Sequence, residues 1–356
     1  MLKRHLSKRL TYRTGVSPTP RRNKVWAASL AQEARKAVAD KISSGSYQLE
    51  ERPCPACDSN ELDIIADVER HGLYFPMAIC RRCGLVHANP VMRDADFRDF
   101  YTRHFRRLYN AREGMPSLEM LQKKKNSNLT QIKRIVNRAP VVQELIASGG
   151  TILDVGCGGG NFTWAWQERG LKATGIDLNG EYQDIGRQQG LDLHAANLEE
   201  FTKHRKFDAI VYHHVLEHIR DPLKELRIVN EALNASGLLI VVVPGLFNAP
   251  NKYLGDLRDY FHIAHTTAFT AETLTFVAAR AGFECLHSDQ HVYAVYRKTN
   301  AIPAVPADPD PEHYEDAMRF MIRMEKRFGS EAHLYSLLDR ASEKHAKSKR
   351  RKKATA

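Results

Sequence analysis

Four cysteines in the first hundred residues have the spacing of metal ligands. They form two C-x-x-C pairs, Cys54 with Cys57 and Cys80 with Cys83, and 22 residues separate the pairs. Four thiolates at this spacing match a closed, tetrahedral zinc site with no open position for a reacting molecule. Cytoplasmic thiols stay reduced, which argues against disulfides, and a redox motif needs only one pair. The sequence therefore predicts a structural zinc site.

A glycine-rich turn carries a second pattern of chemical interest. Residues 151–160 read T-I-L-D-V-G-C-G-G-G, an apolar run that breaks into glycines. A buried strand, a turn and a helix whose N-terminus faces a ligand produce such a pattern. The dinucleotide fingerprint G-x-G-x-x-G fails, because its last position is Asn161. Asp154 would repel a pyrophosphate and attract a cation, and Asp177 is placed to accept hydrogen bonds from ribose hydroxyls.

These residues carry a family resemblance. D-V-G-C-G-G-G followed by G-I-D resembles motifs I and II of class I S-adenosylmethionine-dependent methyltransferases. The alternative is another α/β nucleotide site whose glycines serve only the turn. The resemblance implies S-adenosylmethionine as cofactor, with the methionine part near the glycine turn, the ribose on Asp177 and the adenine near the two segments that follow. Asn197 stands where the family usually has aspartate. The implied cofactor-binding residues are Asp154, Gly156, Cys157, Gly158, Asp177, Leu178, Asn197, Leu198 and His213.

Histidines gather after two predicted strands. The stretch Y-H-H-V-L-E-H, ending at His218, resembles the post-strand motif of many class I methyltransferases, including the ubiquinone-pathway O-methyltransferases. F-H-I-A-H, ending at His265, lies in the loop after the fifth strand. Both segments belong to the carboxyl edge of the sheet, over the acceptor site. The side chains of interest are His214, Glu217, His218, His262 and His265.

Three roles remain open for this histidine group. His214 or His265 would act as a general base, because the pKa of histidine lies near neutrality. Alternatively, the group would hold a second, divalent metal against the acceptor hydroxyl, as in some sugar-hydroxyl methyltransferases that act on RNA ends. A structural or substrate-orienting role is the third interpretation. The candidate catalytic residues are His214, His218 and His265.

The elements that position these residues follow from the alternation of apolar and amphipathic segments after residue 150. This alternation predicts a doubly wound, Rossmann-like α/β fold with a parallel sheet and its ligands at the carboxyl ends of the strands. Two last strands would add the antiparallel edge hairpin typical of class I methyltransferases. The expected strands are 151–155, 171–176, 191–195, 207–212, 238–243, 284–288 and 292–297; the expected helices are 117–148, 160–169, 180–189, 198–204, 221–234 and 271–281.

Domain organisation follows from composition. Residues 1–50 are expected to be a basic arm and a helix, 51–110 a zinc-binding domain and 111–299 the methyltransferase domain. Residues 300–356 combine a proline-rich linker, one or two helices and a basic tail. Cys285 is expected in the core.

The net charge of +11 is concentrated at the two ends of the chain. Residues 1–24 hold eight Lys and Arg, residues 344–356 hold seven, and neither end holds an acid, so the remainder is close to −4. A nucleic-acid-binding face on the core is therefore disfavoured. The tails are candidates for contact with anionic surfaces, although solvated ends are the simpler interpretation. No apolar run approaches a membrane span or a signal core, and a cytoplasmic location is expected.

The zinc-ligand pattern also bears on the acceptor. Together with the N-P turn at Asn89 and the F-x-x-F-Y segment that ends at Tyr101, it resembles a group of methyltransferases common among enzymes that modify sugars, nucleotide-linked sugars and surface polysaccharides. We therefore expect methyl transfer to a small-molecule or carbohydrate acceptor, at a sugar oxygen or carbon. The alternatives are an rRNA or tRNA methyltransferase and a non-catalytic cofactor-binding scaffold.

Overall fold

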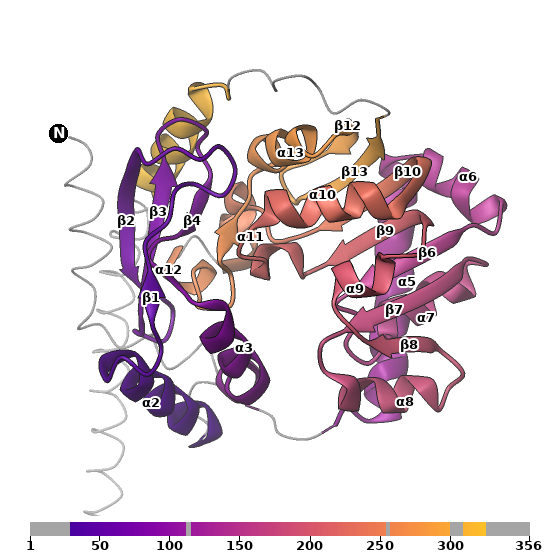
Figure 1. The fold of residues 1–356 in the computed structure, drawn as a ribbon, viewed down its shortest axis with the longest axis horizontal. Coiled ribbons are helices and arrows are strands. Elements are labelled where there is room, and N and C mark those ends of the chain that lie inside the picture. Colours follow the sequence, from indigo (N-terminus) through magenta and orange to yellow (C-terminus); the bar gives the residue numbers. More distant parts are fainter. Residues whose placement is uncertain (1–28, 112–114, 254–256, 300–308, 325–356) are drawn as a thin grey trace, which may run out of the picture.

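The computed structural model describes residues 29–111, 115–253, 257–299 and 309–324. They form a large α/β unit and a smaller β-rich unit that lie side by side (Figure 1). The predicted basic tails and most of the proline-rich linker lie outside the described residues. Within the described part of the chain, every helix is too short or too polar to cross a membrane.

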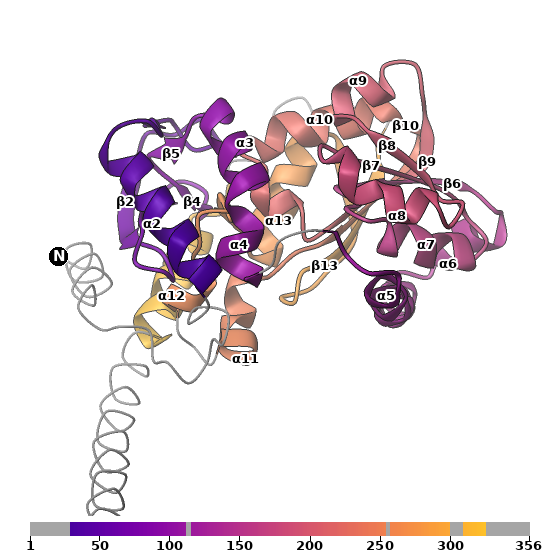
Figure 2. The same ribbon diagram turned by 90° about the horizontal axis from the view of Figure 1, so that it is seen from below.

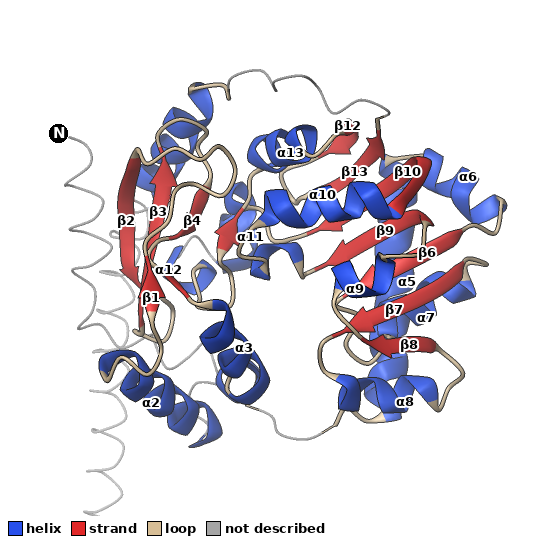
Figure 3. Cartoon of the chain, in the orientation of Figure 1, coloured by secondary structure: helices blue, strands red, loops and turns tan. Residues whose placement is uncertain are grey.

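The large sheet has the strand order β12-β13-β10-β9-β6-β7-β8. Strands β10, β9, β6, β7 and β8 run parallel to one another. Strand β13 runs antiparallel to both β10 and β12 (Figure 3). This arrangement confirms the predicted Rossmann-like sheet with an antiparallel edge hairpin. The chain order reverses between β6 and β9, which is where doubly wound sheets bind ligands. The strands are β6 (Thr151–Val155), β7 (Lys172–Asp177), β8 (Asp192–Ala195), β9 (Phe207–His213), β10 (Leu233–Val242), β12 (Phe283–Ser288) and β13 (Tyr293–Lys298).

Helices cover both faces of this sheet because successive strand residues point to opposite sides. Leu153 and Ile210 belong to the apolar core on one face, and their neighbours Ile152 and Val211 belong to the core on the other. Figure 2 shows α9 and α10 on one side and α5 and α7 on the other. The first face carries α9 (Leu198–Thr202), α10 (Pro222–Ala232) and α13 (Ala271–Arg280); the second carries α5 (Leu118–Arg138), α6 (Val141–Ala147) and α7 (Asn161–Glu168). Between β7 and β8 lie η2 (Gly180–Gln183) and α8 (Asp184–Arg187).

One strand of the smaller unit's sheet comes from the chain segment that follows β10 of the large sheet. The smaller sheet has the order β11-β4-β3-β2, and β11, which follows β10 in the chain, pairs antiparallel with β4 through Thr267 and His87. The sheet strands are β2 (Leu62–Val68), β3 (Tyr74–Cys80), β4 (Val86–Ala88) and β11 (Thr267–Ala268). A separate pair consists of β1 (Leu49–Glu50) and β5 (Val91–Met92), and the helices are α2 (Ser29–Ser43), α3 (Asp94–Arg103) and α4 (Phe105–Asn110).

The core of the smaller unit joins three distant parts of the sequence. Phe75 and Phe100 pack in one apolar cluster with Phe261 from the segment after β10 and with Met321 near the C-terminus. The segment after β10 contains η4 (Leu246–Asn248), α11 (Ala249–Tyr253) and α12 (Leu257–Tyr260), and residues 312–324 form a helix. The segment after β10 is therefore held by the smaller unit.

Two expectations about the large unit are wrong. The single helix predicted over 117–148 is divided, because α5 ends at Arg138 and α6 begins at Val141. Pro140 lies between them; it has no backbone N–H to donate, and its ring clashes with the carbonyl of the preceding turn. Cys285 is exposed instead of lying in the core, since β12 forms the edge of the sheet.

Candidate active site

The glycine turn after β6 has two positions that differ in their surroundings. A Cβ on Gly156 would lie 2.5 Å from Cγ2 of Val215, so this backbone approaches the segment after β9 closely. A Cβ on Gly158 would meet nothing within 4 Å, and its φ of +55° favours glycine. The Gly158 N–H donates to Oδ2 of Asp177 at 3.0 Å. The turn therefore leaves open space beside a carboxylate at the switch point of the sheet.

Asp154 lies beneath this turn and is only 2% exposed. The Thr163 hydroxyl, from the first turn of α7, donates to its Oδ2 at 2.7 Å. Burial raises the pKa of Asp154 to about 7; the Thr163 hydrogen bonds oppose this rise and the negative charge of Asp177 adds to it. A cation in the open space would stabilise the ionised carboxylate.

The other predicted cofactor residues have different surroundings. Asp177 accepts a second hydrogen bond from the Asn179 N–H at 2.9 Å, which fixes its carboxylate at the end of β7. Leu178 is 68% exposed and offers a bare apolar face. Asn197 is the N-cap of α9, where its side chain accepts the Glu200 N–H at 2.9 Å. Cys157 and Leu198 are buried. The ring centroid of His213 lies 4.3 Å from the ring centroid of Phe162 in α7.

The three candidate catalytic histidines converge on one carboxylate. Glu217 lies in η3 (Leu216–His218) and is 2% exposed. Its Oε1 lies 3.5 Å from Nδ1 of His214, 3.8 Å from Nε2 of His218 and 3.8 Å from Nε2 of His265. His214 has a φ of +58°, a left-handed conformation that is uncommon outside glycine and that concentrates at functional sites. Burial lowers the pKa of His218 and thereby favours its neutral imidazole.

Aromatic side chains of the smaller unit cover this histidine group. Tyr101 in α3 and Phe105 in α4 each place a ring 5.9 Å from that of His218, edge to face. Burial of the Tyr101 hydroxyl, together with the charges of Asp177 and Glu217, raises the pKa of that hydroxyl. The glycine turn itself lies against the segment after β9, because Gly156 approaches Val215, the residue between His214 and the 3-10 turn that carries Glu217. The two groups therefore border one site.

A buried hydrogen-bond network positions the loop that carries His265. The Tyr109 hydroxyl donates to Oε2 of Glu69 at 3.0 Å and accepts the Ile263 N–H at 3.1 Å. The ring of His262 lies 4.6 Å from that of Tyr109, and the His265 N–H donates to the His262 carbonyl at 2.8 Å. The loop is therefore fixed from the smaller unit.

Residues 125–288 match the family model described as a methyltransferase domain. This segment contains the glycine turn, Asp177 and the histidine group. The matched segment is a methyltransferase domain.

Curated relatives match a part of the same region. The ubiquinone biosynthesis O-methyltransferase of Actinobacillus pleuropneumoniae serotype 7 is 33% identical over 103 residues, which is 26% of this chain and 44% of that protein. The Coxiella burnetii protein of the same name is 27% identical over 163 residues, or 44% of this chain and 61% of that protein. The chain thus matches about half the length of these relatives.

Solved methyltransferases also show partial similarity. Burkholderia thailandensis 1,6-didemethyltoxoflavin-N1-methyltransferase is 16% identical, with a TM-score of 0.40 over 61% of this chain and 96% of that chain. CalS10, an amino pentose methyltransferase from Micromonospora echinaspora, is 14% identical, with a TM-score of 0.35 over 50% of this chain and 92% of that chain.

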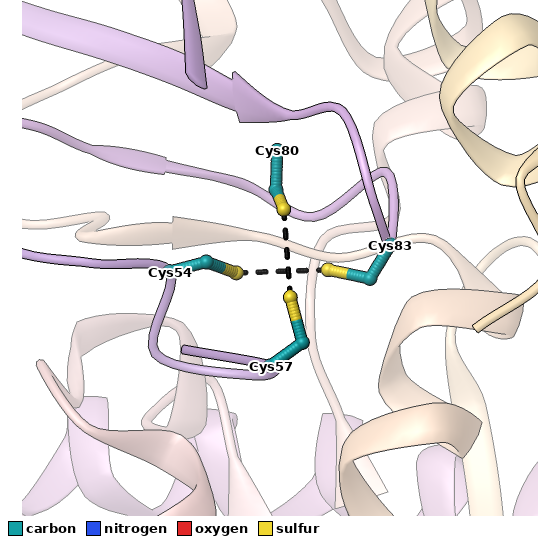
Figure 4. A group of neighbouring side chains, drawn as sticks. All are labelled: Cys54, Cys57, Cys80 and Cys83. Carbon is teal, nitrogen blue, oxygen red and sulfur yellow. Dashed lines mark hydrogen bonds between the residues drawn. The ribbon is translucent and has the colours of Figure 1, made fainter. Parts of the chain in front are cut away.

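The four cysteines of the smaller unit face one another beside the methyltransferase domain (Figure 4). The Sγ atoms of Cys54 and Cys83 are 3.6 Å apart, and those of Cys57 and Cys80 are 3.5 Å apart. All four sulfurs lie within 4.8 Å of one another. A tetrahedral zinc ion with Zn–S bonds of about 2.3 Å places its sulfurs about 3.8 Å apart, so the cluster fits zinc.

Some residues at the site of the methyltransferase domain were not predicted from the sequence. The sequence pointed to Tyr101 only as the end of the F-x-x-F-Y segment and to Tyr109 only as the end of the aromatic-rich stretch that follows, and it assigned no role to Phe105 or Glu69. The aromatic spacing over 97–109 was the available signal. That spacing could not indicate that these residues contact the histidine group, because the contact depends on how the smaller unit packs against the large one.

Proposed function

We propose that this protein is an enzyme that transfers a methyl group from S-adenosylmethionine to a hydroxyl of a small acceptor, with a carbohydrate as the preferred class. The observation that carries the proposal is the single site formed by the glycine turn, Asp177 and the group around Glu217. The relatives named O-methyltransferases support oxygen as the accepting atom. The zinc-ligand pattern beside the domain supports the carbohydrate class by resemblance.

The cofactor would be bound along the carboxyl edge of the sheet. Its methionine part would be bordered by Asp154, Gly156, Cys157 and Gly158. The open space at Gly158 would admit the amino and carboxyl groups of that methionine part. Asp177 would accept hydrogen bonds from the ribose hydroxyls, because each of its oxygens has a lone pair beyond those used by the backbone N–H groups. Leu178, Asn197, Leu198 and His213 would complete the pocket, and Leu178 would lose its exposed apolar surface against the adenine.

The chemistry requires an acceptor oxygen in line with the methyl group and a group that takes the hydroxyl proton. The cofactor supplies a methyl group on a positively charged sulfur, which leaves as a neutral thioether when the new O–C bond forms. The side chain of His214 is 39% exposed, whereas those of His218 and His265 are 11% exposed. We therefore assign His214 as the residue that accepts the proton, and Phe105 as a residue that helps to exclude water.

The four cysteines have a separate, structural role in this proposal. Four thiolates would surround a zinc ion completely, so the metal would stabilise the fold and take no part in methyl transfer. The expected cytoplasmic location agrees with reduced thiols.

Replacing Asp177 with alanine should weaken cofactor binding by about 10- to 150-fold, because hydrogen bonds to a charged group contribute about 1.5–3 kcal/mol. Calorimetric titration of the purified full chain with S-adenosylhomocysteine measures this change. Asp192→Ala is the matched control, since Asp192 is exposed at the amino end of β8, away from the carboxyl edge. Equal affinities for wild type and Asp177→Ala would refute the proposed ribose contact, and no binding by the folded wild type would refute the enzyme.

A further inference from the structure

We propose that Glu217, His218 and His265 bind a divalent transition-metal ion, separate from the cysteine cluster, and that this ion holds the acceptor hydroxyl. The metal site itself stands on the geometry of these side chains. Its role toward the acceptor rests on the proposed function.

The carboxylate of Glu217 is buried without the partners that a buried charge needs. Neither Oε1 nor Oε2 has a hydrogen-bond partner, although the residue is 2% exposed. An ionised carboxylate left unpaired in a protein interior is strongly disfavoured. Within the described chain, its ion-pair contacts are all with histidines. A cation beside this carboxylate would pair with its charge.

The distances fit ligands around one ion better than they fit hydrogen bonds. Oε1 of Glu217 lies 3.8 Å from the Nε2 atoms of both His218 and His265, beyond the 2.7–3.2 Å of a hydrogen bond. Two donor atoms bound at about 2.1 Å lie about 3.0 Å apart at right angles and about 4.2 Å apart when opposite. Both 3.8 Å separations fall between these two values, so Glu217, His218 and His265 form a group that could hold one ion.

The donor set indicates the class of metal. Two imidazoles and one carboxylate suit first-row divalent ions such as zinc, cobalt, iron and manganese, and they leave coordination positions open. An acceptor hydroxyl that takes such a position has a lowered pKa. His214, whose Nδ1 is 3.5 Å from Glu217, is then adjacent to receive the proton. The proton moves from the hydroxyl to His214 while the methyl group moves from sulfur to oxygen.

The ligand loops are held independently of any metal. The His218 N–H donates to the Val215 carbonyl at 2.9 Å, and the Thr266 hydroxyl donates to the Ile219 carbonyl at 3.0 Å. The first bond lies within the segment after β9, and the second joins that segment to the one that carries His265. The backbone therefore brings together side chains that are far apart in the sequence, and such preorganisation favours metal binding.

Cobalt(II) uptake tests the site without requiring activity. The full chain is treated with a chelator until only the zinc of the cysteine cluster remains, and then titrated with Co²⁺ while visible absorption and cobalt content are recorded. We expect one further Co²⁺ per chain, with weak visible bands and without the thiolate charge-transfer absorption that cobalt among cysteines would give. Glu217→Gln and His265→Ala should weaken uptake by about 100-fold or more, since even outer-shell changes cost 10–100-fold.

Matched controls keep the test decisive. Glu199→Gln and His204→Ala alter exposed residues near α9 and should bind cobalt as the wild type does. Near-ultraviolet circular dichroism of each variant verifies that it is folded. No additional cobalt in the wild type, or equal uptake by folded Glu217→Gln, would overturn the metal site. Titration of the same samples with S-adenosylhomocysteine separates this result from the proposed function, because cofactor binding does not need Glu217.

Discussion

Replacing Cys80 with serine should release the zinc and unfold much of the smaller unit. Cys80 is fully buried, and the four cysteines pack in the same apolar cluster as Leu274 and Val277 of α13. Arg280 of α13 also donates to the carbonyl of Ala56, between the first two cysteines. Structural zinc contributes about 10–16 kcal/mol in zinc-finger peptides, so losing one thiolate should remove a large part of the stability of this unit.

Elemental analysis and thermal unfolding measure the two consequences of this change. Wild type should contain one zinc in the cysteine cluster, and Cys80→Ser should contain almost none and melt at a much lower temperature. Cys285→Ser is the control, because this exposed thiol on β12 lies outside the cluster. A Cys80→Ser protein that keeps its zinc and its melting temperature would show that the four thiols serve only packing.

The large sheet was predictable because its pattern is local. Each strand is a short apolar run bounded by turn residues, and β6 has the predicted bounds of Thr151–Val155. The helix predicted over 117–148 was wrong because of a single residue. Apolar positions continue at helical spacing past Pro140, but this proline divides the helix. The exposure of Cys285 follows from the edge position of its strand, which is a property of the whole sheet.

The site was predictable only where local sequence patterns determine it. Gly158 follows β6 and Asp177 ends β7, so the rule for doubly wound sheets places them at one edge. That rule also led to the pairing of the two histidine segments. It says nothing about Tyr101 or Tyr109, because these residues reach the site through the docking of the smaller unit. The pairing of β11 with β4 fixes that docking, and a two-residue strand has no sequence signature.

Replacing Asp154 with asparagine should stabilise the cofactor-free protein at pH 8 and weaken its binding of S-adenosylmethionine. The pKa of Asp154 is about 7 in the folded chain, against about 3.9 in an unfolded one. Between these values the folded state holds a proton that the unfolded state has released, so the free energy of unfolding falls as pH rises from about 4 through 7. Asparagine does not ionise, so the variant should lack this fall and gain about 1–4 kcal/mol at pH 8.

The same ionisation should strengthen cofactor binding. Wild-type affinity for S-adenosylmethionine should increase by up to about tenfold per pH unit below pH 7 and level off above it, because the ionised carboxylate attracts the positively charged ligand. S-adenosylhomocysteine lacks the sulfonium charge, so its affinity should depend less on pH and should fall less in Asp154→Asn. Urea unfolding and calorimetric titration at pH 5, 6, 7 and 8 measure both effects, with exposed Asp192→Asn as the control. An Asp154→Asn protein that is less stable at pH 8 yet binds both ligands as the wild type does would show that Asp154 serves the fold through Thr163 and not the cofactor. Stability gained together with cofactor affinity lost is the signature of a charge buried for its ligand.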